Sequence, residues 1–215
     1  MNSELIRNDF PILKTKVGGH QIVYFDNAAT TQRPLPVVNA VLDYTTHENG
    51  NPHRGAHIFA ISASEAYDTS KEVVRDFIHA RSEKEIIYTR NTSESLNLVA
   101  RSYGETHLKA GDHILITIAE HHSNLVTWQS VAQKTGATLD YIYVDKETGH
   151  FPEEELKKID DPRVKLFAFA EVSNVLGIDF DPKPLIQRAH AHGAIVVLAG
   201  AQSTPHKIVD VQDLD

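Results

Sequence analysis

Four clusters of polar residues, each following an apolar run, could carry chemistry in this sequence. The first, residues 90–94 (Arg-Asn-Thr-Ser-Glu), precedes a strongly periodic helical stretch. A helix N-terminus offers unpaired backbone N–H groups and a positive dipole end, and the hydroxyls of Thr92 and Ser93 add donors, so a phosphate could bind there. The same residues also fit an ordinary capping box, which the segment taken alone favours.

The second cluster, residues 120–124, contains the adjacent histidines His121 and His122. Such a pair suggests a metal site, an acid/base or a ring-stacking role, although two exposed loop residues remain an alternative. A metal is the weakest idea, because adjacent histidines rarely point at one ion and no third ligand is spaced to complete a set. We therefore predict no metal site.

The third and fourth clusters each contain one side-chain amide. Asn174, in residues 172–177, could orient a ligand oxygen, or it could simply be a turn residue before Gly177. Gln202 lies among small residues in 199–206, where backbone can approach a ligand closely, or where a strand makes a tight exit. Two further polar segments, residues 26–31 and 51–57, are weak signals on their own.

The elements that must position these clusters alternate between strands and helices. We predict strands at residues 22–26, 85–89, 113–118, 138–144, 164–170 and 195–199, several of them continuously apolar, as expected of strands covered on both faces. Helical periodicity appears in residues 64–78, 92–103 and 184–192, with Gly193 at the usual stop position. This alternation predicts an α/β fold with a mostly parallel sheet, whose ligands bind beyond the carboxyl ends of the strands.

Composition narrows the functional classes. The 215 residues are 41% hydrophobic and carry a net charge of −8, which disfavours nucleic acid as a main partner. The sequence contains no run that could span a membrane and no signal-like N-terminus, so we expect a cytoplasmic protein without membrane partners. It contains no cysteine, which excludes disulfides and thiolate chemistry from its own residues.

In order, the polar segments resemble the class V aminotransferase family, specifically the SufS-type (group II) cysteine desulfurases. The matching pieces are YFDNAATTQRP, NPHRGAH, YTRNTSESLNLVA, AEHHSNLVTWQ, VSNVLGID and GAQSTPH-x3-DVQDLD. The resemblance implies the N-terminal portion of a fold-type I, pyridoxal-phosphate-dependent transferase, with residues 1–20 as an N-terminal arm and 21–215 as an incomplete large domain. The parent activity converts L-cysteine to L-alanine and a persulfide for iron–sulfur cluster assembly.

The resemblance also assigns roles to single residues. Thr92 and Ser93 match the contacts to the phosphate of pyridoxal 5'-phosphate. His121 matches the catalytic histidine that stacks on the pyridine ring and assists proton transfer. Asn174 and Gln202 match the residues beside the ring hydroxyl. Segments that line the substrate entrance, partly across a dimer interface, correspond to Ala28, Ala29, His53 and Arg54.

The sequence departs from the family pattern in three places. Ala199 stands where the family has an aspartate that keeps the pyridine nitrogen protonated. Ala170 and Glu171 replace a usual Thr-His pair. The 215 residues end before the family's Ser-x-His-Lys segment, so they include neither the cofactor lysine nor the downstream cysteine and arginine. Lys207 aligns with no cofactor lysine, and we expect its side chain to be solvated.

These departures make the enzymatic status of the chain uncertain. We expect a truncated desulfurase homologue that is inactive alone and binds the cofactor weakly or not at all. Alternatives are a non-catalytic module that regulates a full-length desulfurase, and a half-enzyme complemented in trans. The expected partners are a second copy in a homodimer, a C-terminal half or full-length desulfurase, and a sulfur-acceptor protein.

Overall fold

The structure, a computed structural model, describes residues 3–214 and divides the chain into two compact units. Unit 1 is Met1–Val74 and unit 2 is Arg75–Asp215. Helix α3 (Ile58–Ile78) passes through the boundary between them. The boundary expected after residue 20, between an arm and a large domain, stays a prediction.

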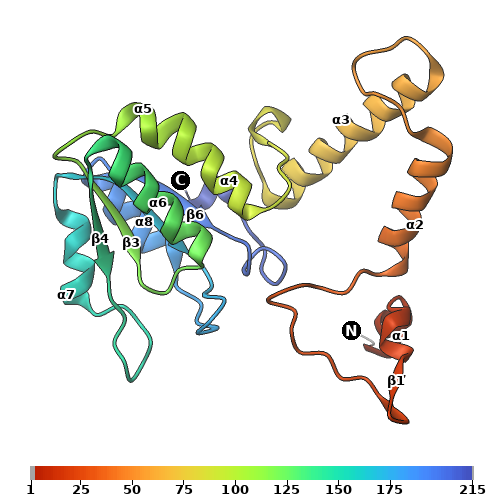
Figure 1. Cartoon of the computed structure of the whole chain (residues 1–215), viewed down its shortest axis with the longest axis horizontal. Helices are drawn as coiled ribbons and strands as arrows, with labels where there is room; N and C mark the ends of the chain where they lie inside the picture. The colour runs from red at the N-terminus through yellow and green to blue at the C-terminus, as the bar shows by residue number, and fades with distance from the viewer. Residues whose placement is uncertain (1–2, 215) are drawn as a thin grey trace. The chain divides into compact units, whose positions relative to one another are not determined.

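Unit 1 is built from helices and one short hairpin (Figure 1). It contains α1 (Ser3–Asn8), a 3-10 helix (Pro11–Lys14), strands β1 (Lys16–Val17) and β2 (His20–Gln21), helix α2 (Leu35–Asp43) and a π-helical turn (Tyr44–Glu48), followed by α3. Gly18 and Gly19 connect β1 to β2 with φ of +59° and +83°, a conformation that glycine adopts without steric cost. The predicted strand 22–26 is wrong: this segment is extended but pairs with no described strand.

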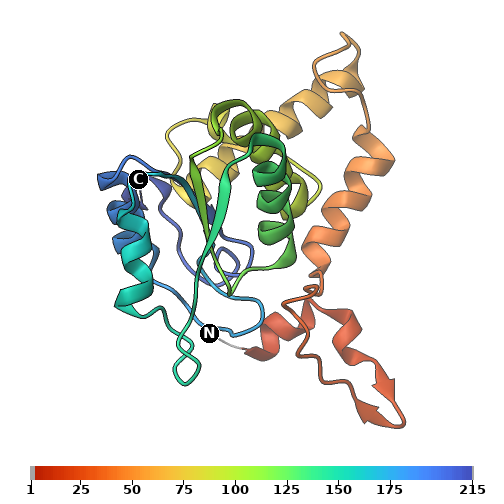
Figure 2. The same ribbon diagram turned by 60° about the vertical axis from the view of Figure 1, so that its left-hand side comes forward.

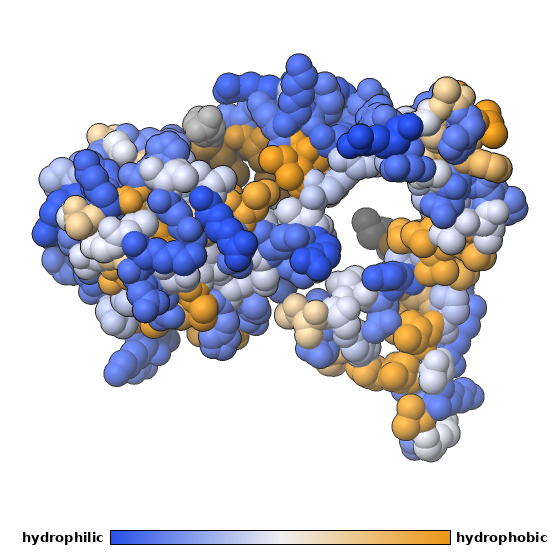
Figure 3. Space-filling view, turned by 45° about the horizontal axis from the view of Figure 1, so that its top comes forward, coloured by the Kyte–Doolittle hydropathy of each residue, from blue (hydrophilic) through white to orange (hydrophobic). Residues whose placement is uncertain are grey.

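Unit 1 leaves most of its apolar side chains exposed. Neither α1 nor α2 contributes a buried residue, and the buried hydrophobic residues of the described part of this unit are Ala60 and Ala63. Phe25 is 93% exposed. Hydrophobic residues accordingly gather on the surface of this unit (Figure 3). Exposed apolar patches are a common property of protein interaction surfaces.

Unit 2 is an α/β unit around a four-stranded parallel sheet. Its strands are β3 (His113–Thr117), β4 (Thr138–Ile142), β5 (Val164–Ala170) and β6 (Ile195–Ala199), in the order β4-β3-β5-β6. The helices are α4 (Thr92–Val99), α5 (Glu105–His107), α6 (His122–Thr135), α7 (Glu153–Leu156), α8 (Pro182–Ala191) and α9 (Val211–Leu214), with a π-helical turn (Ala100–Gly104) and 3-10 helices (Glu83–Glu85, Lys157–Asp160). The predicted α/β class with a parallel sheet is confirmed.

Helices cover both faces of this sheet (Figure 2). On one face Leu115 and Phe167 pack with Ile186 of α8. On the other face Ile114 and Leu166 pack with α6, with the turn after α4 and with Leu108. Alternate residues of the strands thus enter two separate cores, which explains the continuously apolar runs Ile114–Ile116, Leu166–Ala170 and Ile195–Ala199.

Most predicted elements of unit 2 are confirmed, and one is wrong. Strands 164–170 and 195–199 have the expected bounds, and strands 113–118 and 138–144 end one and two residues early. The predicted strand 85–89 is wrong: Glu85 ends the 3-10 helix Glu83–Glu85, and no described strand pairs with residues 86–89. Gly193 follows α8 with φ of +78°, as a helix stop requires. Among the described residues, no helix is long and apolar enough to cross a membrane.

Candidate functional site

The start of α4 presents two hydroxyls without partners. Asn91 caps the helix by accepting a hydrogen bond from the Glu94 N–H at 3.0 Å, and Glu94 accepts one from the Arg90 N–H at 2.6 Å. The capping interaction is therefore present, but it uses neither Thr92 nor Ser93. Both residues are exposed, and their hydroxyls form no hydrogen bond with the described residues. The cap and an anion site can coexist at this helix start.

His121 is the N-cap of α6, and its hydrogen bonds fix which ring nitrogen is the acceptor. Its Nδ1 accepts the Ser123 N–H at 3.1 Å and lies 2.8 Å from the Ser123 hydroxyl. Because a backbone N–H can only donate, Nδ1 is an acceptor, and the proton of the neutral ring is assigned to Nε2. The ring is exposed, so Nε2 is available to a ligand.

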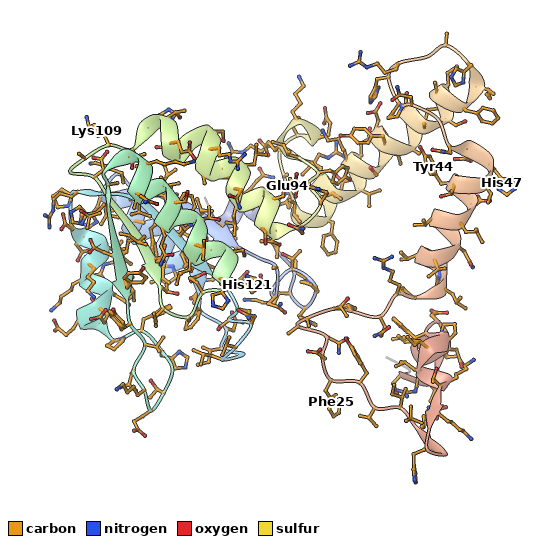
Figure 4. The ribbon with its side chains drawn as sticks, viewed as in Figure 1. Phe25, Tyr44, His47, Glu94, Lys109 and His121 are labelled. Carbon is orange, nitrogen blue, oxygen red and sulfur yellow. The ribbon has the colours of Figure 1, made fainter. Side chains whose placement is uncertain are left out.

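Helices α4 and α6 lie side by side with corresponding ends together (Figure 4). The Asn97 amide donates to the Thr127 hydroxyl at 3.3 Å, which joins the sixth residue of α4 to the sixth residue of α6. Asn97 also donates to the carbonyl of Ser93 at 2.8 Å. The hydroxyls at the start of α4 and the histidine at the start of α6 are thereby placed at neighbouring helix ends.

Glu120 fixes the loop that carries His121. Its carboxylate accepts hydrogen bonds from the Thr117 hydroxyl, from the Asn124 amide at 2.7 Å and from the Ala170 N–H at 3.0 Å. Burial raises the pKa of Glu120 above its ordinary value, and these three hydrogen bonds oppose the shift. Asn124 in turn accepts the Trp128 indole N–H at 2.7 Å. This network ties the end of β3, the start of α6 and the end of β5 together.

Asn174 lies in the loop that follows β5, residues 171–180, which we call the asparagine loop. The buried Ser173 hydroxyl donates to the Ala119 carbonyl at 3.0 Å, linking this loop to the segment just before Glu120. Val172 and Asp179 form an isolated bridge that closes the loop on itself. The Asn174 side chain is half-buried and forms no hydrogen bond with the described residues. Its predicted contact with a ligand stays a prediction.

Gln202 lies in the loop that follows β6, residues 200–207, which we call the glutamine loop. The loop turns tightly: the Thr204 N–H donates to the Gly200 carbonyl at 3.0 Å, and an added Cβ at Gly200 would lie 2.8 Å from the Thr204 hydroxyl. Gln202 is half-buried. The tight strand exit expected of small residues is found here, and a close approach of backbone to a ligand stays a prediction.

The four residues assigned to the substrate entrance belong to unit 1, whereas the other predicted site residues belong to unit 2. The Ala29 N–H donates to the Asp26 carbonyl at 3.3 Å, and Ala28 lies in the same turn. His53 has φ of +59°, and its backbone N–H donates to the Ser64 hydroxyl oxygen at 2.8 Å. Its ring Nε2 lies 3.4 Å from the Asp68 carboxylate. Arg54 is exposed in the same loop. Their roles at the site stay predictions.

Sequence reasoning missed two residues that organise this site. Glu120 had no assigned role, although its spacing of four from Asn124 on a helix start predicts contact. Lys207 was expected to be solvated, but its ammonium contacts Glu171 at 2.6 Å and Asp179 at 2.9 Å. Its carboxylate partners lie 36 and 28 positions earlier in the sequence, so no local pattern could reveal them.

Comparison with known proteins decides the family, because residues 23–215 match aminotransferase class-V. This chain belongs to that family. One class-V relative is a probable cysteine desulfurase of Halalkalibacterium halodurans, which is 46% identical over all of this chain and 52% of the relative. Another is a cysteine desulfurase of Synechococcus elongatus, which is 46% identical over 98% of this chain and 33% of the relative. The apo structure of a cysteine desulfurase from Thermococcus onnurineus is 39% identical with a TM-score of 0.88, over 98% of this chain and 50% of that one.

This class-V chain spans about half the length of the relatives, or less. Membership of the family implies pyridoxal 5'-phosphate as cofactor. The described residues fit part of that molecule: two hydroxyls without partners at a helix start fit its phosphate, and the half-buried Asn174 amide fits a ring substituent. They do not fit the ring nitrogen, because Ala199 has no carboxylate to offer.

Proposed function

We propose that this chain is the cofactor-binding N-terminal half of a SufS-type cysteine desulfurase, which acts on L-cysteine and supplies sulfur for iron–sulfur clusters. The observation that carries the proposal is the start of α4, where the hydroxyls of Thr92 and Ser93 form no hydrogen bond with any residue that the structure describes and lie beside the unpaired N–H groups of the helix. The family resemblance and the neighbouring His121 support the same assignment.

The roles of the residues follow from their surroundings. Thr92, Ser93 and the positive end of α4 bind the phosphate group. His121 covers the pyridine ring, and its Nε2 holds the proton that can be exchanged with substrate, since Nδ1 is occupied by Ser123. Asn174 and Gln202 orient the ring hydroxyl. Pyridoxal phosphate, when bound, supplies a ring that takes up electrons from a bond broken at the substrate's α-carbon.

Ala199 weakens the site at the ring nitrogen. Ala199 pairs in register with Ala170, and the alternate strand residues Ala168 and Val197 pack in the core beneath α6. The Ala199 methyl group therefore lies on the α4 and α6 face but offers no negative charge. Loss of one preorganised electrostatic partner commonly costs on the order of 3 kcal/mol in barrier, roughly a hundredfold in rate.

We propose that these 215 residues do not release sulfur from cysteine by themselves. They include no cysteine to accept sulfur, and Lys207 is held by two carboxylates. The missing nucleophiles come from the region that corresponds to the second half of the relatives, in the same or another chain.

The first experiment measures the non-covalent site. Pyridoxine 5'-phosphate has no aldehyde, so it does not react with surface lysines, and its affinity for the purified chain is measured by titration calorimetry. We expect the double substitution Thr92→Val with Ser93→Ala to weaken binding about tenfold, the effect of losing about 1.4 kcal/mol of hydrogen bonding. Ser102→Ala is the matched control, because its hydroxyl bonds the Leu98 carbonyl away from the helix start. Equal affinity in all three proteins would refute the phosphate assignment.

The second experiment measures activity. Sulfide release from L-cysteine is compared for the chain alone, for the chain with a separately produced C-terminal half of a related desulfurase, and for the same pair carrying Ala199→Asp. We expect no release above the free-cofactor background for the chain alone, slow release for the pair, and about a hundredfold faster release with Ala199→Asp. Equal rates with alanine and aspartate would contradict the account of position 199.

The exposed apolar surface of unit 1 favours a second candidate function, that of a non-catalytic partner of a full-length desulfurase. Phe25 and Val23 are 93% and 72% exposed, more than an isolated unit of this size normally leaves in water. Light scattering after size-exclusion chromatography distinguishes the two proposed functions. A homodimer supports the function as half of a desulfurase, whereas a complex formed only with a full-length desulfurase supports the function as a non-catalytic partner.

A further inference from the structure

A three-residue ion-pair cluster connects the two loops that carry the predicted amide ligands. The Lys207 ammonium lies 2.6 Å from a Glu171 carboxylate oxygen and 2.9 Å from an Asp179 carboxylate oxygen. The Glu171 side chain is 7% exposed and that of Lys207 is 34% exposed. Both carboxylates raise the pKa of Lys207, so the ammonium stays charged.

The cluster spans two separate loops. Glu171 and Asp179 belong to the asparagine loop, which the Phe180 N–H closes by donating to the Glu171 carbonyl at 2.8 Å. Lys207 belongs to the glutamine loop, and its N–H donates to the carbonyl of the buried Ser203 at 2.9 Å. A shift of either loop along the sheet edge must therefore break a contact of Lys207.

The cluster lies on the sheet face opposite to Ala199. Glu171 follows Ala170, the register partner of Ala199, and successive strand residues point to opposite faces. Glu171 accordingly lines a pocket with Ile186 of α8 and Leu198 of β6, residues of the core on the α8 face. Its carboxylate therefore does not replace the aspartate that Ala199 lacks, and its charge is balanced by Lys207 instead.

We propose that Lys207 is a positioning residue, which with Glu171 and Asp179 forms an ion-pair clamp that sets the separation of Asn174 and Gln202. The clamp is a property of the two loops, and only its effect on the cofactor rests on the proposed function. Removing Lys207 leaves the Glu171 charge buried and uncompensated, so the loops must rearrange to hydrate it. The ring substituents of the cofactor would then meet misplaced amides, while the phosphate contacts at α4 stay intact.

The test uses the 215-residue chain and two readouts. The first is hydrogen exchange of the backbone amides in both loops. The second is the affinity for pyridoxine 5'-phosphate, compared with the affinity for inorganic phosphate, which reports the α4 contacts alone. We expect Lys207→Met to speed exchange in both loops about tenfold and to weaken pyridoxine phosphate binding about tenfold, with phosphate binding unchanged. Lys207→Arg, which keeps the charge, restores both properties.

Lys183→Met is the matched control, because Lys183 forms an equally short ion pair with Asp213 at 2.6 Å that joins α8 to α9 instead of the two loops. If Lys207→Met fails to fold, Asp179→Asn is the variant that tests the clamp. It removes the more exposed contact of Lys207 and leaves Glu171 paired, so we expect a smaller increase in the rate of amide hydrogen exchange in both loops. Unchanged exchange, or a change confined to one loop, would overturn the clamp. Absence of pyridoxine phosphate binding by the unaltered chain would refute the proposed function, and the exchange readout would still decide the clamp.

Discussion

Replacing Glu120 with alanine removes the acceptor at the centre of the network behind His121. The Thr117 hydroxyl also donates to this carboxylate, but a hydroxyl can rotate toward another acceptor. The Asn124 amide at 2.7 Å and the Ala170 N–H at 3.0 Å are fixed in direction, and both of these donors lose their partner in the variant. Asn124 is 1% exposed, and its oxygen already accepts the Trp128 indole N–H, so the amide cannot turn without losing that bond.

The expected loss of stability follows from these two donors. A buried donor left unsatisfied costs about 1–3 kcal/mol, so two of them give about 2–6 kcal/mol. Ala170 is only half-buried, and water that reaches its N–H moves the expectation to about 2–4 kcal/mol. Against a total stability of about 5–15 kcal/mol for a domain, this is a large fraction.

The sequence contains a single tryptophan, Trp128, which is fully buried and belongs to the same network, so its fluorescence reports urea unfolding of unit 2 directly. The matched control is Glu154→Ala, whose side chain is 82% exposed. We expect the control to change the free energy of unfolding by less than about 0.5 kcal/mol. Equal losses in the two variants would refute the reasoning that the Glu120 hydrogen bonds, rather than helix propensity, hold this loop.

Three further predictions concern the stability of unit 2. Because burial raises the pKa of Glu120, the folded state binds its proton more tightly than the unfolded state. The free energy of unfolding therefore falls as pH rises from the ordinary glutamate range through the raised pKa. The substitution Glu120→Gln should remove this fall in urea titrations across pH 4–8. Arg188→Lys should lower the free energy of unfolding by about 1 kcal/mol, because Arg188 donates two hydrogen bonds of 2.6 Å to the Asp160 carboxylate that lysine cannot reproduce. As a control, Arg163→Lys at the exposed ion pair with Asp161 should leave the urea midpoint unchanged. Gly193→Ala should cost about 1–2 kcal/mol in thermal unfolding, since φ is +78° there, and Gly193→Asn should cost less.

Local patterns predicted the core strands of unit 2 because burial leaves a direct trace in sequence. The strand Ile195–Ala199 is apolar throughout, and Val164–Ala170 is apolar except for the exposed Lys165; the bounds of both were predicted without error. Residues 22–26 and 85–89 have similar composition but are not strands. Strand formation requires a hydrogen-bonding neighbour, and a local pattern carries no information on whether one is present.

The place of a predicted site residue in the fold could be inferred where its position relative to a strand or helix end was enough, although its role at the site stays a prediction. Asn174 and Gln202 were expected after strands, and they lie in loops that leave neighbouring strands β5 and β6. The partners of Lys207 could not be predicted, because contacts between distant residues depend on the sheet order. The capping of α4 was expected from Thr92 or Ser93, but Asn91 performs it, and only side-chain geometry distinguishes these three neighbours.

The two outer strands of the sheet differ in how they resist unwanted pairing. Strand β4 carries Asp140, a charge that discourages another strand from adding beside it, whereas β6 consists only of Ile, Val, Leu and Ala and has β5 as its neighbour in the described sheet. Strand β6 is thus a template for β-augmentation, by a partner segment or by a second β6 in a misassembled fibril. Whatever covers β6 in the cell governs the solubility of this protein as well as its assembly.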